Sequence, residues 1–231
     1  MLLYLLFMLP PLILMIWAQA RISSAYNKYS KVRNMSGLTG VQAAQTLLDY
    51  NGLRQVTIEG AKGRLTDHYD PRHKVLRLSP DVARVPSVAA LGIVAHEVGH
   101  AVQDNVGYAP LRIRSTLVPA ANLGSRFGFI CVILGLILYA FGAGFGLDVM
   151  WVGIGLFAAA VLFALVTLPV EYNASNHARH MLQATGLVSA QEYQGASAVL
   201  SAAALTYVAA LLQAVAQLFY FVMLAMGMGR R

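Results

Sequence analysis

Four stretches of this chain are each long and apolar enough to cross a lipid bilayer as a helix. A spanning helix needs about 20 mainly apolar residues, and residues 1–20, 117–143, 149–169 and 199–226 meet that condition. Hydrophobic residues make up 58% of the 231 residues and charged residues only 12%, whereas charged residues are about a quarter of an ordinary soluble domain. The sequence therefore predicts a multi-pass membrane protein.

The first apolar stretch has features of both an anchor and a cleavable signal peptide. It ends in Ala18-Gln19-Ala20, which resembles a signal-peptidase site, but no basic residue precedes the apolar run, which is also long for a signal peptide. We expect an uncleaved anchor. Pro10-Pro11 should kink or divide this helix, because proline lacks the N–H that a helix interior needs.

The basic residues are distributed unevenly. Of the 17 Lys and Arg residues, 13 lie between residues 21 and 116, whereas the connection at residues 142–148 has none. Because basic residues favour the cytoplasmic side, we expect an outside amino terminus, a cytoplasmic segment over residues 21–116 and a cytoplasmic return near Pro169. Arg230 and Arg231 would then lie outside, against this rule. Topology explains the net charge of +7 better than nucleic-acid binding does, because aromatic and basic residues are not interleaved.

Residues 21–116 are predicted to form a small α+β unit. Thr39-Gly40-Val41-Gln42 is a capping-box pattern, and the helix that it starts should end at Asn51-Gly52. Ser87 can cap a second helix that runs to about Asn105. Between these helices, short apolar runs bounded by turn residues predict three strands, at Val56–Glu59, Leu65–Tyr69 and Lys74–Leu78.

The whole chain is thus expected to be an α+β membrane protein, mainly α, with about four transmembrane helices and a short β-sheet. The expected segments are a transmembrane helix over 1–20, a cytoplasmic domain over 21–116, two transmembrane helices over 117–169, a cytoplasmic helix over 170–198, and a last transmembrane helix with its tail over 199–231.

The stretch His96-Glu97-Val98-Gly99-His100 lies within the second predicted helix. Residues four apart on a helix are neighbours, so both imidazoles can reach one metal ion at about 2 Å, with a carboxylate beside the first histidine. The alternative is a helix whose histidines are merely solvated or hydrogen-bonded. The pattern favours a site for one catalytic Zn²⁺ ion, with His96 and His100 as ligands.

A catalytic zinc site needs a third protein ligand on the same side of the membrane. The chain crosses the membrane twice after His100 and returns to its starting side at Glu171, one of three acidic residues outside residues 21–116. We expect Glu171 to be that ligand. The alternative is an interfacial carboxylate satisfied by water or by Arg179.

Four stretches, at residues 65–79, 87–103, 168–175 and 203–209, carry a resemblance to a known family, and two of them include the histidines and Glu171. By these stretches the chain resembles the YugP-type bacterial membrane zinc metallopeptidases and, more distantly, gluzincins of the HtpX type, in which a glutamate on a later helix is the third ligand. The resemblance implies a zincin-like domain, with His96, His100 and Glu171 as metal ligands and Glu97 as the catalytic residue.

One position departs from the family pattern. The family usually has Glu-Phe-Asp-Ala-Ser where this chain has Glu171-Tyr172-Asn173-Ala174-Ser175. An amide at 173 can still hydrogen-bond a ligand, but it adds no negative charge to raise the basicity of a histidine. Asp104, four residues after His100, is another candidate for that orienting contact.

The expected reaction is hydrolysis of peptide bonds in proteins or peptides by zinc-activated water, with Glu97 as general base. His177, His180 and Tyr172 are candidate donors to the oxyanion, because they follow Glu171 closely. If the strand Lys74–Leu78 lies at an open sheet edge, an extended substrate could pair with it.

The expected partners are a polypeptide substrate, including segments of membrane proteins, and the lipid bilayer, with no nucleic acid. We expect a location in the bacterial plasma membrane with the active site on the cytoplasmic side. The competing functions are a catalytically silent zinc-binding scaffold or chaperone, which would not need Glu97, and a metal transporter. A transporter would need ionisable residues in mid-membrane, and the spans have almost none.

Overall fold

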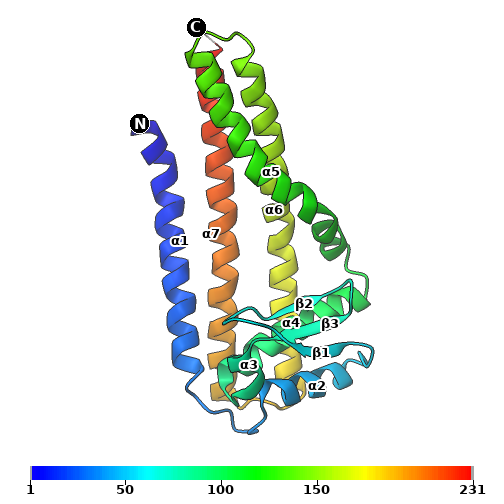
Figure 1. The fold of residues 1–231 in the computed structure, drawn as a ribbon. Helices are drawn as coiled ribbons and strands as arrows, with labels where there is room; N and C mark the ends of the chain where they lie inside the picture. The colour runs from blue at the N-terminus through cyan, green and yellow to red at the C-terminus, as the bar shows by residue number, and fades with distance from the viewer. Residues whose placement is uncertain (1, 230–231) are drawn as a thin grey trace. The chain divides into compact units, whose positions relative to one another are not determined.

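The computed structural model describes residues 2–229, so the predicted position of Arg230 and Arg231 falls outside the described residues. The helices and strands, coloured in chain order in Figure 1, are α1 (Leu2–Tyr29), α2 (Gly40–Tyr50), β1 (Thr57–Gly60), β2 (His68–Asp70), β3 (Val75–Leu78), α3 (Pro80–Arg84), α4 (Val88–Asn105), α5 (Ala109–Ala140), α6 (Gly146–Ala184) and α7 (Ala190–Met228).

Within the described residues, four helices are long and apolar enough to cross a membrane, namely α1, α5, α6 and α7. Together with one small sheet, they confirm the predicted α+β membrane protein that is mainly helical. α1 continues through Pro10 and Pro11, so the division of this helix suggested by the sequence does not occur. Transmembrane helices tolerate proline because neighbouring groups and local adjustments satisfy the freed carbonyls.

The chain forms two compact units. Among the described residues, the membrane unit comprises residues 2–17, 112–169 and 207–229, and the sheet unit comprises residues 18–111 and 170–206. In the membrane unit, α5 and α6 approach closely at glycines, since a Cβ on Gly128 would lie 2.8 Å from the carbonyl oxygen of Gly153. All residues of the candidate site described below belong to the sheet unit.

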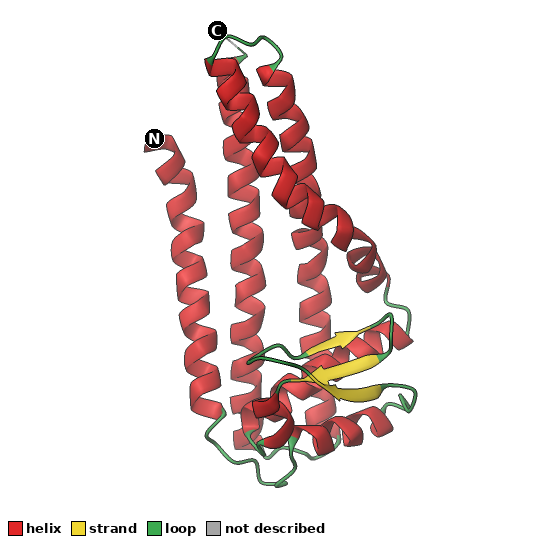
Figure 2. Ribbon diagram, viewed as in Figure 1, coloured by secondary structure: helices red, strands yellow, loops and turns green. Residues whose placement is uncertain are grey.

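The three strands lie in the order β1-β3-β2 (Figure 2). β1 is parallel to β3, and β2 is antiparallel to it with Tyr69 opposite Leu76. The prediction of an open edge at Lys74–Leu78 is therefore wrong, because β3 is the central strand and is paired on both sides. Its apolar side chains at Val75, Leu76 and Leu78 are all buried, which explains why it occupies the centre.

Two predicted helix starts are confirmed. α2 begins at a capping box in which Thr39 and Gln42 each accept a hydrogen bond from the other's backbone N–H. α4 begins after Ser87, whose Oγ accepts a hydrogen bond from Ala90 N at 3.1 Å, and it ends at Asn105 as expected. The core of the sheet unit joins these helices to β3 and to α6 through fully buried side chains that include Leu47, Leu76, Leu91, Val94, Val98 and Leu182.

Residues 170–198, expected as a cytoplasmic helical segment that carries Glu171, contain the end of one helix and the start of the next. α6 ends at Ala184, followed by Gly186 with a φ of +64° that suits glycine. α7 then starts at a second capping box, in which Ser189 N donates to Glu192 Oε2 at 2.8 Å and Glu192 N donates to Ser189 Oγ at 3.3 Å. Residues 170–206 therefore supply two helical segments to the sheet unit.

Candidate metal centre

Two histidines stand next to each other on α4. His96 and His100 are one turn apart, and their ring centroids lie 4.8 Å from each other. The rotation of this helix is fixed by Leu91, Val94 and Val98, which are completely buried in the core of the sheet unit. The apolar pattern of α4 thus holds both imidazoles in place.

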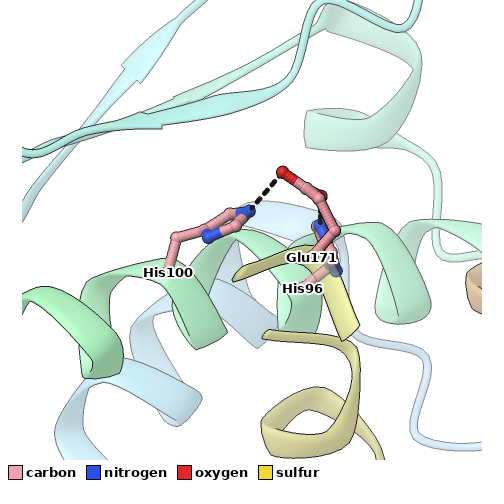
Figure 3. Close-up of side chains that lie close together, drawn as sticks. All are labelled: His96, His100 and Glu171. Carbon is pink, nitrogen blue, oxygen red and sulfur yellow. Dashed lines mark hydrogen bonds and ion pairs between the residues drawn. The ribbon is translucent and has the colours of Figure 1, made fainter. Parts of the chain in front are cut away.

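Glu171 meets these histidines from α6. Its Oε2 lies 3.1 Å from His96 Nε2, and its Oε1 lies 3.7 Å from His100 Nε2. Figure 3 shows the three side chains converging from the two helices. Glu171 is only 1% exposed, so its carboxylate is shielded from water and faces the two imidazoles.

The three side chains fit a zinc ion. One ligand atom from each residue lies within 4.8 Å of the others, and two ligands of a tetrahedral ion at about 2.0–2.1 Å are roughly 3.3 Å apart. The distances of 3.1 and 3.7 Å from Glu171 to the two histidines lie on either side of that value. Two imidazoles and one carboxylate are also a donor set found in catalytic zinc sites.

The outer nitrogens of the two histidines have partners as well. His100 Nδ1 lies 3.0 Å from Gln103 Oε1, and His96 Nδ1 lies 3.2 Å from Ser175 Oγ. In both rings Nδ1 is therefore held by a neighbour while Nε2 faces Glu171. Gln103 and Ser175 were not predicted as partners of the site, although Gln103 follows His100 by three residues and Ser175 follows Glu171 by four, which are helix-neighbour spacings.

The two candidates for an orienting contact, Asn173 and Asp104, have different partners. Asn173 does not reach a histidine in the contacts of the described chain, but its Oδ1 accepts a hydrogen bond from Gln103 Nε2 at 2.8 Å. Asp104 accepts a hydrogen bond from the Tyr69 hydroxyl at 2.8 Å and forms an ion pair with Lys74. Asp104 thus connects α4 to β2 and to the residue before β3.

Glu97 lies beside His96 and is 9% exposed. Its Oε2 accepts a hydrogen bond from the backbone N–H of Tyr69 at 3.0 Å, so strand β2 holds the carboxylate. Burial raises the pKa of Glu97 above its ordinary value, against the opposing effect of the neighbouring His96 and His100. This is the environment of a carboxylate that can exchange a proton.

The three candidate oxyanion donors also lie on α6, and they differ from the metal-binding group in their exposure. Tyr172 and His180 are exposed, and His177 is partly exposed. Within the described chain, the group that could hold a metal consists of His96, His100 and Glu171. Arg179 donates hydrogen bonds to three polar side chains on α6 and α7, namely Asn176, Ser197 and Ser201.

Comparison with known proteins identifies a family and a relative of this chain. A family model described as "Putative neutral zinc metallopeptidase" matches residues 4–226. The "Putative membrane protease YugP" of Bacillus subtilis (strain 168) is 43% identical over 208 residues, which cover 90% of this chain and 90% of the relative. No solved structure matches the chain.

Proposed function

Because this chain belongs to the neutral zinc metallopeptidase family, we propose that His96, His100 and Glu171 hold its Zn²⁺ ion and that Glu97 is its general base. The substrate class is polypeptide, cleaved internally. The observation that carries the proposal is the convergence of one ligand atom from each of the three residues within 4.8 Å.

In the proposed mechanism the zinc ion and Glu97 have different roles. Zinc at such a site lowers the pKa of water and polarises a carbonyl group. Glu97 accepts the proton from the attacking water and then gives it to the leaving nitrogen of the cleaved peptide bond. The Tyr69 N–H, which donates to Glu97 Oε2 at 3.0 Å, keeps the carboxylate in one orientation between these two transfers.

The distribution of charge supports a proposed location for the active site. Residues 21–116 hold 13 of the 17 Lys and Arg residues and include α4, so the positive-inside tendency favours a cytoplasmic active site in a bacterial plasma membrane. The five segments expected from the sequence give the corresponding topology. The domain over 21–116 is cytoplasmic, and the pair of transmembrane helices over 117–169 begins and ends on the cytoplasmic side. The substrates would then be proteins or membrane-protein segments near the cytoplasmic surface.

A silent zinc-binding scaffold is the competing function. It would use His96, His100 and Glu171 but would have no need of a buried carboxylate at Glu97. The two functions therefore differ in what happens when Glu97 loses its charge.

Substitution of Glu97 with Gln tests the proposal. The variant should keep one zinc ion per chain, while its kcat/KM on an unfolded, fluorescently labelled protein should fall by about 10²–10⁴-fold. Glu59→Gln is the matched control, because Glu59 is an exposed acid of the same unit that pairs with Arg77. Cleavage by Glu97→Gln at the wild-type rate would remove Glu97 from the mechanism, and absence of zinc-dependent cleavage in the wild type would favour the scaffold.

A further inference from the structure

Gln103 is a completely buried amide at 0% exposure, one turn beyond His100 on α4. We infer that Gln103 is a positioning residue, which fixes the ring of His100 with its proton on Nδ1 and ties that ring to the peptide just before Glu171. The inference rests on the proposed function in one respect, namely that His100 and Glu171 bind zinc.

The orientation of the Gln103 amide is determined by its partners. Its Nε2 lies 2.8 Å from the carbonyl oxygen of Val170 and 2.8 Å from Asn173 Oδ1. A backbone carbonyl can only accept a hydrogen bond, so the NH₂ group must be on that side. The amide oxygen is then on the opposite side, 3.0 Å from His100 Nδ1.

This orientation determines which nitrogen of His100 carries hydrogen. Gln103 Oε1 has no hydrogen to donate, so the contact is a hydrogen bond only when His100 Nδ1 carries the proton. In the neutral ring Nε2 then has the free lone pair, and Nε2 is the nitrogen that faces Glu171 at 3.7 Å. Gln103 thus selects the tautomer that can bind a metal on the side where Glu171 lies.

The same amide links the two helices. Val170 immediately precedes Glu171, so the hydrogen bond from Gln103 to the carbonyl oxygen of Val170 holds the backbone of α6 next to the third ligand. One side chain on α4 therefore contacts both a histidine ligand and the backbone that carries the glutamate. Gln103 fixes His100 and Glu171 relative to each other, which an exposed helix residue could not do.

The role of Asn173 follows from this arrangement. It acts on His100 only through Gln103, because its Oδ1 accepts the second N–H of that amide. An acceptor at position 173 is enough for this purpose, and a negative charge is not required. An amide at position 173 is therefore sufficient for this contact.

The test combines zinc binding with the protonation state of His100. Gln103→Met keeps the volume of the side chain but removes both the donor and the acceptor, and Gln194→Ala on the exposed start of α7 is the control. Competition with a chromophoric chelator should show a zinc Kd that is about 10–100-fold higher for Gln103→Met and unchanged for the control. In the zinc-loaded wild type labelled with ¹⁵N-histidine, NMR should show His100 with its hydrogen on Nδ1, and that hydrogen should exchange faster with water in Gln103→Met.

The outcomes separate this inference from the proposed function. A zinc Kd for folded Gln103→Met within twofold of the wild-type value would overturn the inference. A wild-type spectrum in which His100 Nδ1 carries no hydrogen would overturn it too, even if Gln103→Met failed to fold. If the wild type binds zinc and His96→Ala does not weaken that binding, the proposed ligand set has failed instead.

Discussion

His96 Nε2 and Glu171 Oε2 lie 3.1 Å apart although 75 residues separate them in the chain. One comes from α4 and the other from the later part of α6, within one compact unit. The site therefore depends on how closely these two helices pack.

Gly99 is a point of close approach between these two helices. A Cβ on Gly99 would lie 2.6 Å from the carbonyl oxygen of Ala174. Real Cβ atoms essentially never come this close to another heavy atom. We expect Gly99→Ala to lower the free energy of unfolding by about 1–3 kcal/mol and to weaken zinc binding, because α6 must move away from His96. Thermal unfolding in detergent and chelator competition measure the two effects.

Gly155→Ala is the control for that experiment. Gly155 is a helical glycine of the membrane unit with nothing within 4 Å of its added Cβ. It should leave zinc affinity unchanged. Equal zinc affinities in Gly99→Ala and the wild type would mean that close packing at Gly99 does not set the geometry of the ligands.

Asp104 should contribute to the free energy of unfolding but not to zinc affinity. It accepts a hydrogen bond from Tyr69 at 2.8 Å and pairs with Lys74, whereas His100 is held by Gln103. Asp104→Ala should cost about 2 kcal/mol of unfolding free energy, because it removes hydrogen bonds to a charged group. Its zinc Kd should remain within twofold of the wild-type value, and a tenfold weaker Kd would instead make Asp104 an orienting partner of the site.

The stability of the sheet unit should depend on Asp70 in a particular pH range. The His73 ring hydrogen bond at 2.8 Å, and secondly Arg77 Nη1 at 3.1 Å, hold the pKa of Asp70 below its ordinary value. Because the folded-state pKa is lower than the unfolded value of about 3.9, this carboxylate stabilises the fold above about pH 4. That contribution is lost as the pH falls through the folded-state pKa.

The comparison is between wild type and Asp70→Asn, both with zinc removed by a chelator. The variant should unfold at a lower temperature at pH 7, and the gap between the two proteins should narrow as the pH is lowered below about 4. If the difference in unfolding temperature between the two proteins is the same at pH 7 and below about pH 4, the charge of Asp70 contributes no stability.

The membrane topology can be tested with single cysteines. Cys131 is the single cysteine of the sequence, so Cys131→Ala gives a background free of thiols. On that background, Gly144→Cys in the turn between α5 and α6 should react with an impermeant maleimide added outside intact cells, whereas Gly60→Cys at the end of β1 should react only after the membrane is opened. Both positions are exposed and have room for a side chain. The opposite labelling pattern would place the active site outside.

Much of this arrangement could be predicted from the sequence because its signals are local or charged. Ser87 and the spacing of His96 and His100 predicted α4 and its face. The return of the chain after two spans predicted that Glu171 comes back to that helix. These predictions use helix period and membrane thickness, which are the same in any fold.

Other features could not be predicted because they depend on tertiary contacts. The position of β3 between two strands requires knowledge of which strands pair, and the sequence of Lys74–Leu78 does not contain it. Gln103 and Ser175 are uncharged residues in helices, and their importance is visible only when His100 and His96 are seen beside them. Apart from their helix-neighbour spacing from His100 and Glu171, these two residues have no signature in the sequence.

The most direct test of the account is the zinc content of Glu171→Gln. Equilibrium dialysis against buffered zinc should give one ion per chain for the wild type and for Glu59→Gln. Glu171→Gln should bind zinc at least 10–100-fold more weakly, since loss of a direct ligand should cost at least as much as loss of an orienting partner. Glu171→Gln that folds and binds one zinc ion with wild-type affinity would contradict the proposed metal centre.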